Sequence, residues 1–488
     1  MPCCIPLAPR NPPMTPPVLA RCASSGALAV AALMLGGCAS LPPDGGLQPV
    51  QALTAPHLAQ ALTAPQVAQE RTHTLQALAA QPLTADTAVQ IAWLQSPRWQ
   101  QRFEALGVAE ADRLAASRLP NPSLGFSRSR QGETVSFERS IGVHLIDLLS
   151  WPVLREVQQQ QLTQTRLDTA QAVLRLAHDV RVAWVDAVAA RAARVQAERG
   201  LDAADAARTL ADRMQQAGHW SALRRDQQAA FRADAEQALH AAQAQEVSTR
   251  EHLTRLLGFE RPEAFTLPDH LPPPVTPPRR EEGADGLQPW VQQALDQRLD
   301  VRAAKARVEQ QARALSLSRS TRFINVLEVE GFNESATDEP RKRGIGVTLE
   351  LPLFDLGQSR VHQAEARHRQ ALADTRGVAL DAQSQVREAW RHWQLAEARA
   401  RQQREEVLPR RQRMAEQLLL RYNGMLASVF DLLADAREQQ QAVQLAIALD
   451  QAAWAAHARF ELALTTAPSA GASGAPAPVA RSSAAAHD

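Results

Sequence analysis

Two parts of the chain alternate between apolar and polar residues with a period of two. The apolar positions of the first part are Val135, Phe137, Ile141, Val143 and Leu145, with Arg139 as the exception. Those of the second part are Ile345, Val347, Leu349, Leu351 and Leu353. Because successive side chains of a strand point to opposite sides, this alternation predicts strands with one apolar and one polar face. Together with the segment that precedes each, the expected strands span residues 123–130, 134–146, 323–333 and 343–353.

Long proline-poor segments carry apolar residues every seven positions. Such rows are Ala170, Ala177 and Trp184; Val173, Val180 and Ala187; and Leu372, Ala379, Val386, Trp393 and Ala400. A seven-residue spacing kept over many turns predicts supercoiled helix pairs, and alanine at the seam predicts close packing. The expected long helices span residues 152–216, 219–258, 356–422 and 426–465, and a shorter helix is expected over residues 87–119.

The chain also resembles itself. The spacing between Trp184 and Trp390 is the same as that between Gly218 and Gly424. Each half would contain a helix, two strands, a very long helix, a turn and a second long helix. The expected repeats are residues 86–261 and 285–466, joined by a proline-rich linker over residues 262–284. The fold class is therefore mainly α with a small β part, built from a duplicated unit.

The amino terminus has the layout of a signal peptide. All four cysteines (Cys3, Cys4, Cys22 and Cys38) lie in it. An apolar run over residues 26–35 follows Arg21 and precedes two glycines, which is too short for a membrane span. We expect residues 1–37 to be the signal peptide, with translation starting at Met1 or Met14. No cysteine is left for a zinc site or a thiol nucleophile in the rest of the chain.

The segment Leu35-Gly36-Gly37-Cys38 resembles the bacterial lipoprotein box. That resemblance implies that Cys38 is acylated and becomes the first mature residue, anchored by its acyl chains. Ala39 after the cysteine implies sorting to the outer membrane. The alternative is a signal peptide that merely contains a cysteine. Residues 38–85 are expected to be a lipidated linker, and residues 467–488 a disordered tail.

Charge and motifs exclude several classes of function. The 53 basic residues balance 52 acidic ones, so no net field points to a nucleic-acid partner. The 13 histidines show no metal-ligand spacing, and no known catalytic motif is present. We therefore expect no catalytic residue, no metal site and no cofactor apart from the lipid anchor.

Four strands of bilayer-spanning length pose a physical problem. A tilted strand of about 9–11 residues crosses a bilayer, but four strands cannot close into a barrel with a lumen. An open edge in lipid leaves backbone groups unpaired. Either the sheet lies outside a membrane, or several chains share one barrel. Two chains would supply eight strands and three would supply twelve, which leaves an open channel.

Three segments resemble the TolC-like outer membrane efflux proteins: residues 119–124 (LPNPSL), 349–358 (LELPLFDLGQ) and 421–433 (RYNGMLASVFDLL). The resemblance covers about residues 86–466. It implies a homotrimer with a twelve-stranded transmembrane β-barrel and an α-helical coiled-coil tunnel. It also implies an exit duct for a tripartite efflux or type I secretion system, with a periplasmic adaptor (membrane fusion) protein and an inner-membrane transporter as partners. The alternative is a periplasmic coiled-coil scaffold lipoprotein that does not conduct.

Both long-helix turns contain a glycine, Gly218 and Gly424, which permits the positive φ of a helix stop. The resemblance implies that these turns form the periplasmic tip that meets the adaptor. A turn without a partner is the alternative. Asp431 and Asp435 follow the second turn, and in a trimer they would form rings of carboxylates at a narrow entrance. Ala434 stands where the family often has a second acid, so a solvated role is as open as a gating one.

Glu138 and Glu350 fall on the polar strand faces and are expected to point into the lumen, where simple solvation is the favoured interpretation. Trp184 and Trp390 are expected to pack in the helix seams. The transported substrate stays open, since a duct needs no tight pocket: drugs, metal ions and exported peptides all remain candidates.

Overall fold

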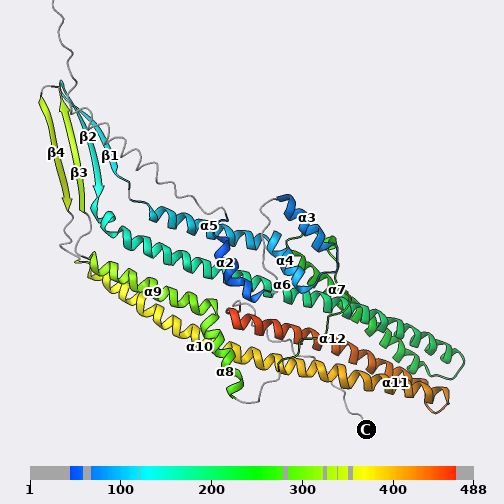
Figure 1. Ribbon diagram of the computed structural model, residues 1–488. Coiled ribbons are helices and arrows are strands. Elements are labelled where there is room, and N and C mark those ends of the chain that lie inside the picture. Colours follow the sequence, from blue (N-terminus) through cyan, green and yellow to red (C-terminus); the bar gives the residue numbers. More distant parts are fainter. Residues whose placement is uncertain are drawn as a thin grey trace, which may run out of the picture. The chain divides into compact units, whose positions relative to one another are not determined.

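Four antiparallel strands and a set of long helices make up the part of the chain that the computed structural model describes, namely residues 44–58, 68–119, 121–278, 284–322, 327–337, 339–349 and 356–468 (Figure 1). These residues belong to one unit, Asp44–Asp488. The expected signal peptide with Cys38, Glu350, and all of the expected tail beyond residue 468 lie outside the described residues. Within the described residues, no helix is both long and apolar enough to cross a bilayer.

The strands form a single sheet in the order β1-β2-β3-β4. They are β1 (Ser123–Gln131), β2 (Thr134–His144), β3 (Leu327–Ala336) and β4 (Glu339–Leu349). Each neighbouring pair is antiparallel, and β2 pairs with β3 across more than 180 residues of intervening chain. The sheet therefore joins the two strand pairs that the sequence predicts separately. β2 ends at His144, two residues before the expected end, because the chain turns directly into a helix there.

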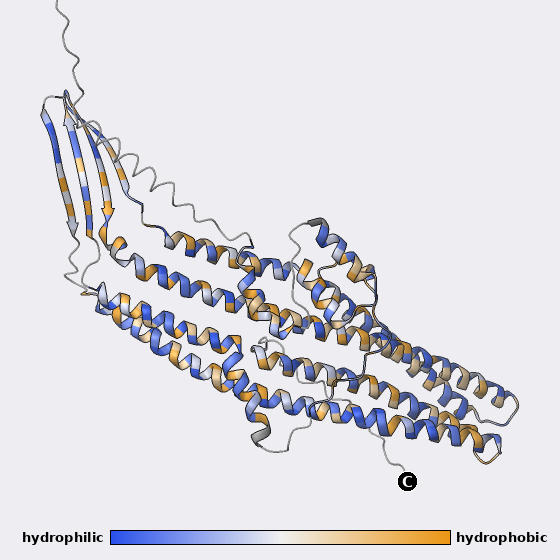
Figure 2. Cartoon of the chain, in the orientation of Figure 1, coloured by the Kyte–Doolittle hydropathy of each residue, from blue (hydrophilic) through white to orange (hydrophobic). Residues whose placement is uncertain are grey.

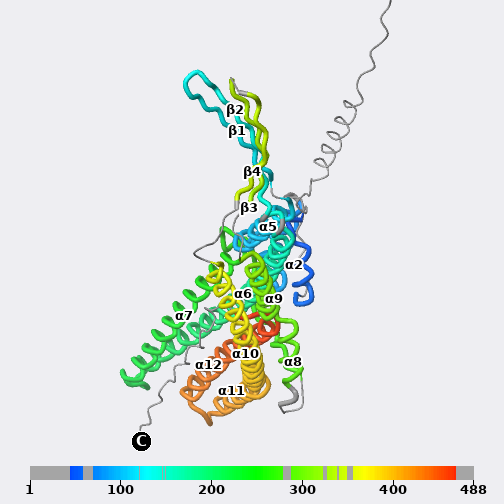
Figure 3. The backbone as a smooth tube through the Cα atoms, turned by 90° about the vertical axis from the view of Figure 1, so that its left-hand side faces the viewer, coloured from blue at the N-terminus to red at the C-terminus, as the bar shows by residue number. Residues whose placement is uncertain are grey.

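The helices are α2 (Leu47–Thr54), α3 (Ala68–Ala79), α4 (Ala85–Gln95), α5 (Pro97–Ser117), α6 (Leu145–Gln216), α7 (Ala222–Leu257), α8 (Ala284–Gln297), α9 (Leu299–Ser320), α10 (Gln358–Gln402), α11 (Leu408–Asn423) and α12 (Val429–Thr465). At 1.5 Å per residue, the 72 residues of α6 span roughly 108 Å. Two hairpins, α6–α7 and α11–α12, end at the side of the unit that is opposite to the sheet (Figures 1 and 3).

Seam positions of the long helices are buried as the seven-residue spacing predicts. The buried positions of α6 include Ala170, Val173, Ala177, Val180, Trp184 and Ala187. The first two share a core cluster with residues of α2, α4, α5 and α9, and the other four share one with residues of α4 and α7. In α10, Val386, Trp393 and Ala400 are buried but Leu372 is 49% exposed. The row in α10 therefore holds only for the part of this helix that packs against α12.

Three departures from the expected helices lie at or near prolines. Pro97 begins α5 and separates it from α4 at Ser96, because proline favours the first turn of a helix and restricts the residue before it. Pro152 lies inside α6 instead of at its start, since the helix begins at Leu145. A π-helical turn, η3 (Gln403–Val407), interrupts the helix expected over residues 356–422, just before Pro409. The ring of Pro409 clashes with the carbonyl four residues earlier, which a wider turn relieves.

The segment expected as a linker over residues 38–85 contains two helices, α2 and α3, and the short 3₁₀ turn η1 (Ala55–His57). Val50 of α2 is fully buried in a cluster with Leu106 of α5 and Leu162 of α6. This part of the expected linker is therefore packed on the helices, because its few apolar residues find a complementary surface on α5 and α6.

The proline-rich linker is attached along the helices by side-chain donors. It begins with a 3₁₀ turn, η2 (Pro262–Ala264). Arg191 donates to the Leu267 carbonyl oxygen (3.1 Å), Trp454 to that of Pro272 (2.8 Å) and Trp393 to that of Val275 (3.3 Å). These bonds satisfy backbone groups that an extended segment cannot satisfy itself. They hold the described part of the linker against α6, α10 and α12.

Candidate functional site

The sheet has two chemically different faces, which Figure 2 shows as alternating blue and orange along the strands. Its apolar face contains Leu124, Phe126, Val135, Phe137, Ile141, Val143, Leu327, Val329, Ile345 and Val347. Its polar face contains Ser127, Ser129, Ser136, Glu138, Ser140, Glu328, Glu330, Glu334 and Thr348. On the apolar face, Leu124 is 80% and Ile345 is 77% exposed. Large apolar side chains exposed in this way mark a surface that meets another apolar phase.

Glu138 lies on the polar face, as predicted. It pairs across the strands with Ser127 and Glu334, and its Oε2 accepts a hydrogen bond from the Ser127 hydroxyl (3.2 Å). The side chain is exposed. This face can line a hydrated space and interact with cations.

Both outer strands of the sheet have an unpaired edge. In the part of the chain that the structure describes, β1 pairs only with β2, and β4 only with β3. The register leaves β1 and β4 with a free row of backbone donors and acceptors over 9 and 11 residues. Exposed edges of this length are normally paired or covered.

The turn that connects α6 to α7, residues 217–221, is a Schellman motif. Gly218 has a φ of +75°, and the His219 amide donates to the Met214 carbonyl oxygen (2.9 Å) while the Gly218 amide donates to Gln215 (3.0 Å). Ser221 then caps α7 by accepting a hydrogen bond from the Arg224 amide. Glycine at this position carries the positive φ without steric cost, as the sequence predicts.

The turn that connects α11 to α12, residues 424–428, differs from the prediction. Gly424 has a φ of −82°, whereas Met425 has a φ of +60°. The Leu426 amide donates to the Arg421 carbonyl oxygen (2.8 Å) and the Met425 amide to Tyr422 (2.9 Å). Met425 is thus the structural equivalent of Gly218, and the helix continues one residue further than the glycine suggested. Met425 is 94% and Leu426 is 78% exposed, so this turn presents apolar side chains outward.

Asp431 completes the start of α12. Its Oδ2 accepts from the Ser428 amide and from the Ser428 hydroxyl, both at 2.8 Å, which is a capping box. The hydrogen bond from the Ser428 backbone holds the pKa of Asp431 below its ordinary value. Asp435 lies one helical turn later and is half-buried. The structure therefore gives Asp431 a capping role at the end of the hairpin.

Aromatic and arginine side chains join the two hairpins near these turns. Trp220 stacks on Phe430, with ring centroids 4.6 Å apart, and the Arg224 guanidinium lies 4.6 Å from the Phe430 centroid. Further along, Arg437 of α12 lies 3.8 Å from the centroid of Phe231 in α7. The same arginine donates to Gln228 (2.8 Å). Sequence reasoning missed this cluster, and the only signal that could have found it is that Trp220 and Phe430 stand close to the two predicted turns.

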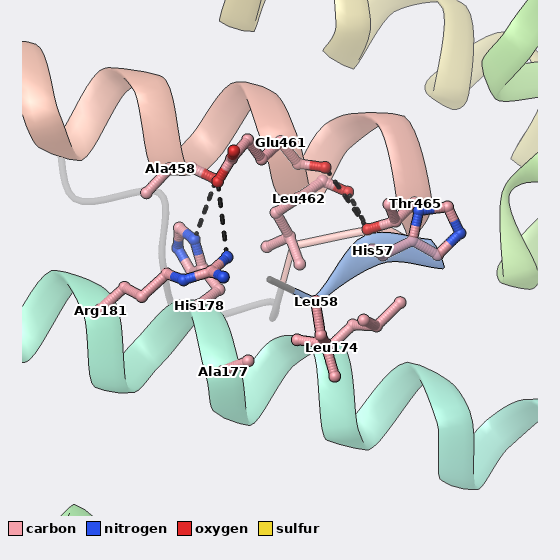
Figure 4. Close-up of a pocket in the computed structure, with 10 residues that line it drawn as sticks. All are labelled: His57, Leu58, Leu174, Ala177, His178, Arg181, Ala458, Glu461, Leu462 and Thr465. Atoms are coloured by element: carbon pink, nitrogen blue, oxygen red, sulfur yellow. Dashed lines mark hydrogen bonds and ion pairs between the residues drawn. The ribbon is translucent and has the colours of Figure 1, made fainter. Parts of the chain in front are cut away.

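A pocket lies between α6 and α12, bordered by His57 and Leu58 (Figure 4). His178 donates from Nδ1 to the Ala458 carbonyl oxygen (3.2 Å), and Arg181 contacts Glu461 (3.5 Å) and Asp86 (3.2 Å). Burial lowers the pKa of His178 to about 4, so it is neutral at pH 7. These polar groups satisfy one another, so the pocket contributes to helix packing.

No group of three or more histidine, cysteine or carboxylate side chains that could hold a metal ion occurs among the described residues. The two tryptophans expected in the seams are both buried. Trp184 donates from Nε1 to the Leu83 carbonyl oxygen (2.8 Å), and Trp390 lies in an aromatic cluster with Trp393 and Phe460.

Comparison with solved structures identifies the fold. The outer membrane protein VceC of Vibrio cholerae matches with a TM-score of 0.64 and 17% identity, over 78% of this chain and 95% of that one. The CmeC outer membrane channel of Campylobacter jejuni matches with a TM-score of 0.64 and 16% identity, over 78% and 85%. A membrane protein from Pseudomonas aeruginosa matches with a TM-score of 0.66 and 18% identity, over 80% and 93%.

No family model and no curated relative matches the sequence. The likeness to outer membrane channels therefore rests on the arrangement of strands and helices. At this level the resemblance is confirmed: the chain has the helix-rich fold of these outer membrane channels.

Proposed function

We propose, from a chain that has the fold of TolC-like outer membrane channels, that this protein is an outer membrane exit duct through which solutes pass passively. The observation that carries the proposal is the four-stranded sheet with an exposed apolar face, a polar face and two unpaired edges. A sheet of this kind suits a barrel wall, with the apolar face toward lipid and the polar face toward water.

Three copies would complete the barrel. The edges of β1 and β4 would pair between neighbouring protomers, giving twelve strands and an open lumen. Exposed leucines of the helical part support a homotrimer as well. Leu372, Leu380 and Leu395 of α10 are 49%, 57% and 64% exposed in the single chain. Neighbouring protomers would bury them in a coiled-coil tunnel.

We further propose that the chain is a duplicated unit. Ser221 and Ser428 cap the second helix of each hairpin in the same way, each after a Schellman turn. Buried Trp184 in α6 and buried Trp390 in α10 are the corresponding seam residues. A duplication explains how one protomer supplies two strand pairs and two hairpins to a trimer.

The amino-terminal lipid remains part of the proposal. Cys38 lies outside the described residues, and its acylation is supported by the sequence Leu35-Gly36-Gly37-Cys38. Acyl chains on Cys38 would anchor the chain in outer membrane lipid, with the helices extending into the periplasm.

The two turns would form the periplasmic tip. The exposed Met425 and Leu426 offer an apolar contact for a periplasmic adaptor protein, with Gly218 at the corresponding first turn. An inner-membrane transporter would supply the energy. Asp431 and Asp435 would add carboxylates at the entrance, and Glu138 and Glu350 would line the lumen.

Planar-bilayer conductance of the purified full-length protein tests the proposal. We expect discrete, stable channel openings with an ohmic current. A tight electrical seal over bilayers that demonstrably contain the folded protein would contradict a duct and favour a scaffold that does not conduct.

A further inference from the structure

Four arginines interrupt the apolar face of the sheet. They are Arg128 and Arg130 in β1, Arg139 in β2 and Arg343 in β4, and we call them the arginine cluster. The register sets Arg128 opposite Phe137, Arg130 opposite Val135 and Arg139 opposite Phe126. All four are exposed and share the face of Leu124, Ile141 and Ile345. The period-two pattern that predicts this apolar face does not account for them.

The cluster occupies one end of that face. Arg139 and Arg343 lie in one row, because both pair with Asn333 of β3. Arg128 and Arg130 lie closer still to the β1–β2 turn. Toward the helices the next rows are apolar: first Leu124, Ile141 and Ile345, then Val143, Val329 and Val347. The face thus has an apolar band next to the helices and a basic band next to the hairpin turns.

Four carboxylates of the sheet lie on the opposite face. Glu138, Glu328, Glu330 and Glu334 all share that side. Among the described residues, none of the four arginines forms an ion pair with a carboxylate. Arg128 lies 5.4 Å from the Phe137 centroid, and Arg130 donates from Nε to the Gly132 carbonyl oxygen (3.0 Å). Within this part of the chain, the positive charge of the cluster is not neutralised and faces outward.

We infer that the arginine cluster binds the phosphate-bearing headgroups of an anionic lipid surface. The inference rests on the proposed function, which sets the apolar band against the hydrocarbon core of a membrane. Arginine is costly at the middle of a bilayer and well tolerated at its interface, so the basic band marks the level at which the sheet leaves the core. Guanidinium groups bind phosphate oxygens in pairs of hydrogen bonds.

The spread of the cluster favours headgroups over a small soluble anion. Its members lie on three strands along an exposed face, whereas one inorganic phosphate needs donors that converge on it. A row of lipids packed around a barrel would present one headgroup to each part of the band. The charge of the headgroups complements that of the face.

Two neighbouring residues of β4 give a matched test. Arg343 points to the apolar face and Lys342, paired with Glu334, to the polar one. We would measure binding of fluorescent lipid A, a bisphosphorylated glycolipid, to the full-length protein in neutral detergent. Arg343→Gln should weaken binding about five-fold, the effect of one basic residue at an anionic surface. Lys342→Gln, with the same change of charge, should leave binding as in the unchanged protein, and inorganic phosphate should not compete.

An equal loss of lipid A binding in both variants would overturn the inference. Displacement of lipid A by inorganic phosphate at a concentration as low as that of lipid A would overturn it too. If Arg343→Gln fails to assemble, the test is made on the unchanged protein alone. It should retain lipid A in preference to phosphatidylcholine, and equal retention of the two lipids would contradict headgroup binding by the arginine cluster. Bilayer conductance of the same samples separates the two proposals. Normal channels without lipid preference would remove only this inference, whereas absent channels in the unchanged protein would remove the duct.

Discussion

Gly218 and Gly424 look alike in the sequence but have different backbone conformations. Gly218 has a φ of +75°, and a Cβ added there would have no atom within 4 Å, so an added methyl group meets only backbone strain. Gly424 has a φ of −82°, and a Cβ there would make ordinary contacts of 3.5 Å or more. The reason is the extra residue in α11, which transfers the left-handed position to Met425.

We therefore expect Gly218→Ala to lower the free energy of unfolding by about 1 kcal/mol, the cost of a left-handed non-glycine residue. Gly424→Ala should leave it unchanged or raise it slightly, because alanine favours the helix end. Urea unfolding of the two variants, followed by helical circular dichroism in detergent, compares them directly. Equal losses would show that both glycines need the positive φ.

His178 gives a second test at the scale of single residues. Its pKa in the folded chain is about 4, against 6.5 for an ordinary histidine, because burial disfavours the charged ring. As the pH falls, the unfolded chain therefore binds a proton before the folded chain does. The stabilisation that neutral His178 gives the folded chain is complete above pH 6.5. It is lost as the pH falls toward 4, by about 3 kcal/mol in total.

In His178→Gln the unfolding free energy should fall less between pH 7 and pH 4 than in the unchanged protein, by roughly that amount. The half-buried Asp179 and Asp186 have pKa values that desolvation raises, and they act in the opposite sense, so the difference between the two proteins is the quantity to measure. His219→Gln, at an exposed position, is the control. Parallel pH profiles for all three proteins would contradict the burial of a neutral His178.

At the scale of elements, the hairpins are joined through the stack of Trp220 on Phe430. Aromatic pairs contribute about 0.5–1.5 kcal/mol beyond their buried area. A double-mutant cycle with Trp220→Leu and Phe430→Leu should therefore give a coupling free energy in that range, measured from unfolding midpoints. Trp220 and Phe231 do not stack on each other, so a cycle on that pair serves as the reference. A coupling near zero for Trp220 and Phe430 would mean that the hairpins are held together elsewhere.

Local periodicity was sufficient to predict which residues of β2 share a face, apart from Leu145, which begins α6, and which seam residues of α6 are buried. The pairing of β2 with β3 was out of reach, because it joins distant parts of the chain and no local pattern specifies it. The same holds for α2, whose Val50 is buried only because α5 and α6 provide a surface for it. Met425 was missed because the glycine before it is the usual helix stop, and the sequence does not show that the helix runs one residue further.

At the scale of the whole molecule, the single chain leaves much of its assembly surface uncovered. The sheet edges at β1 and β4 are unpaired in the described part, and the large apolar side chains Leu124 and Ile345 on the apolar face are mostly exposed. These features are satisfied together when several copies close a barrel in lipid. The two faces of β4 then differ sharply in what they tolerate, since one contacts hydrocarbon and the other contacts water.

Val347 and Thr348 are neighbours on those two faces, and both are exposed. Lysine on the lipid side of a barrel costs about 2–4 kcal/mol near the middle of the membrane. Val347→Lys should therefore reduce the yield of trimers, measured as the fraction of trimeric particles by light scattering in detergent. Thr348→Lys should assemble as the unchanged protein does, because its side chain stays in water. Since both variants add one lysine to the same strand, an equal reduction would show that the β4 faces are not divided between lipid and lumen.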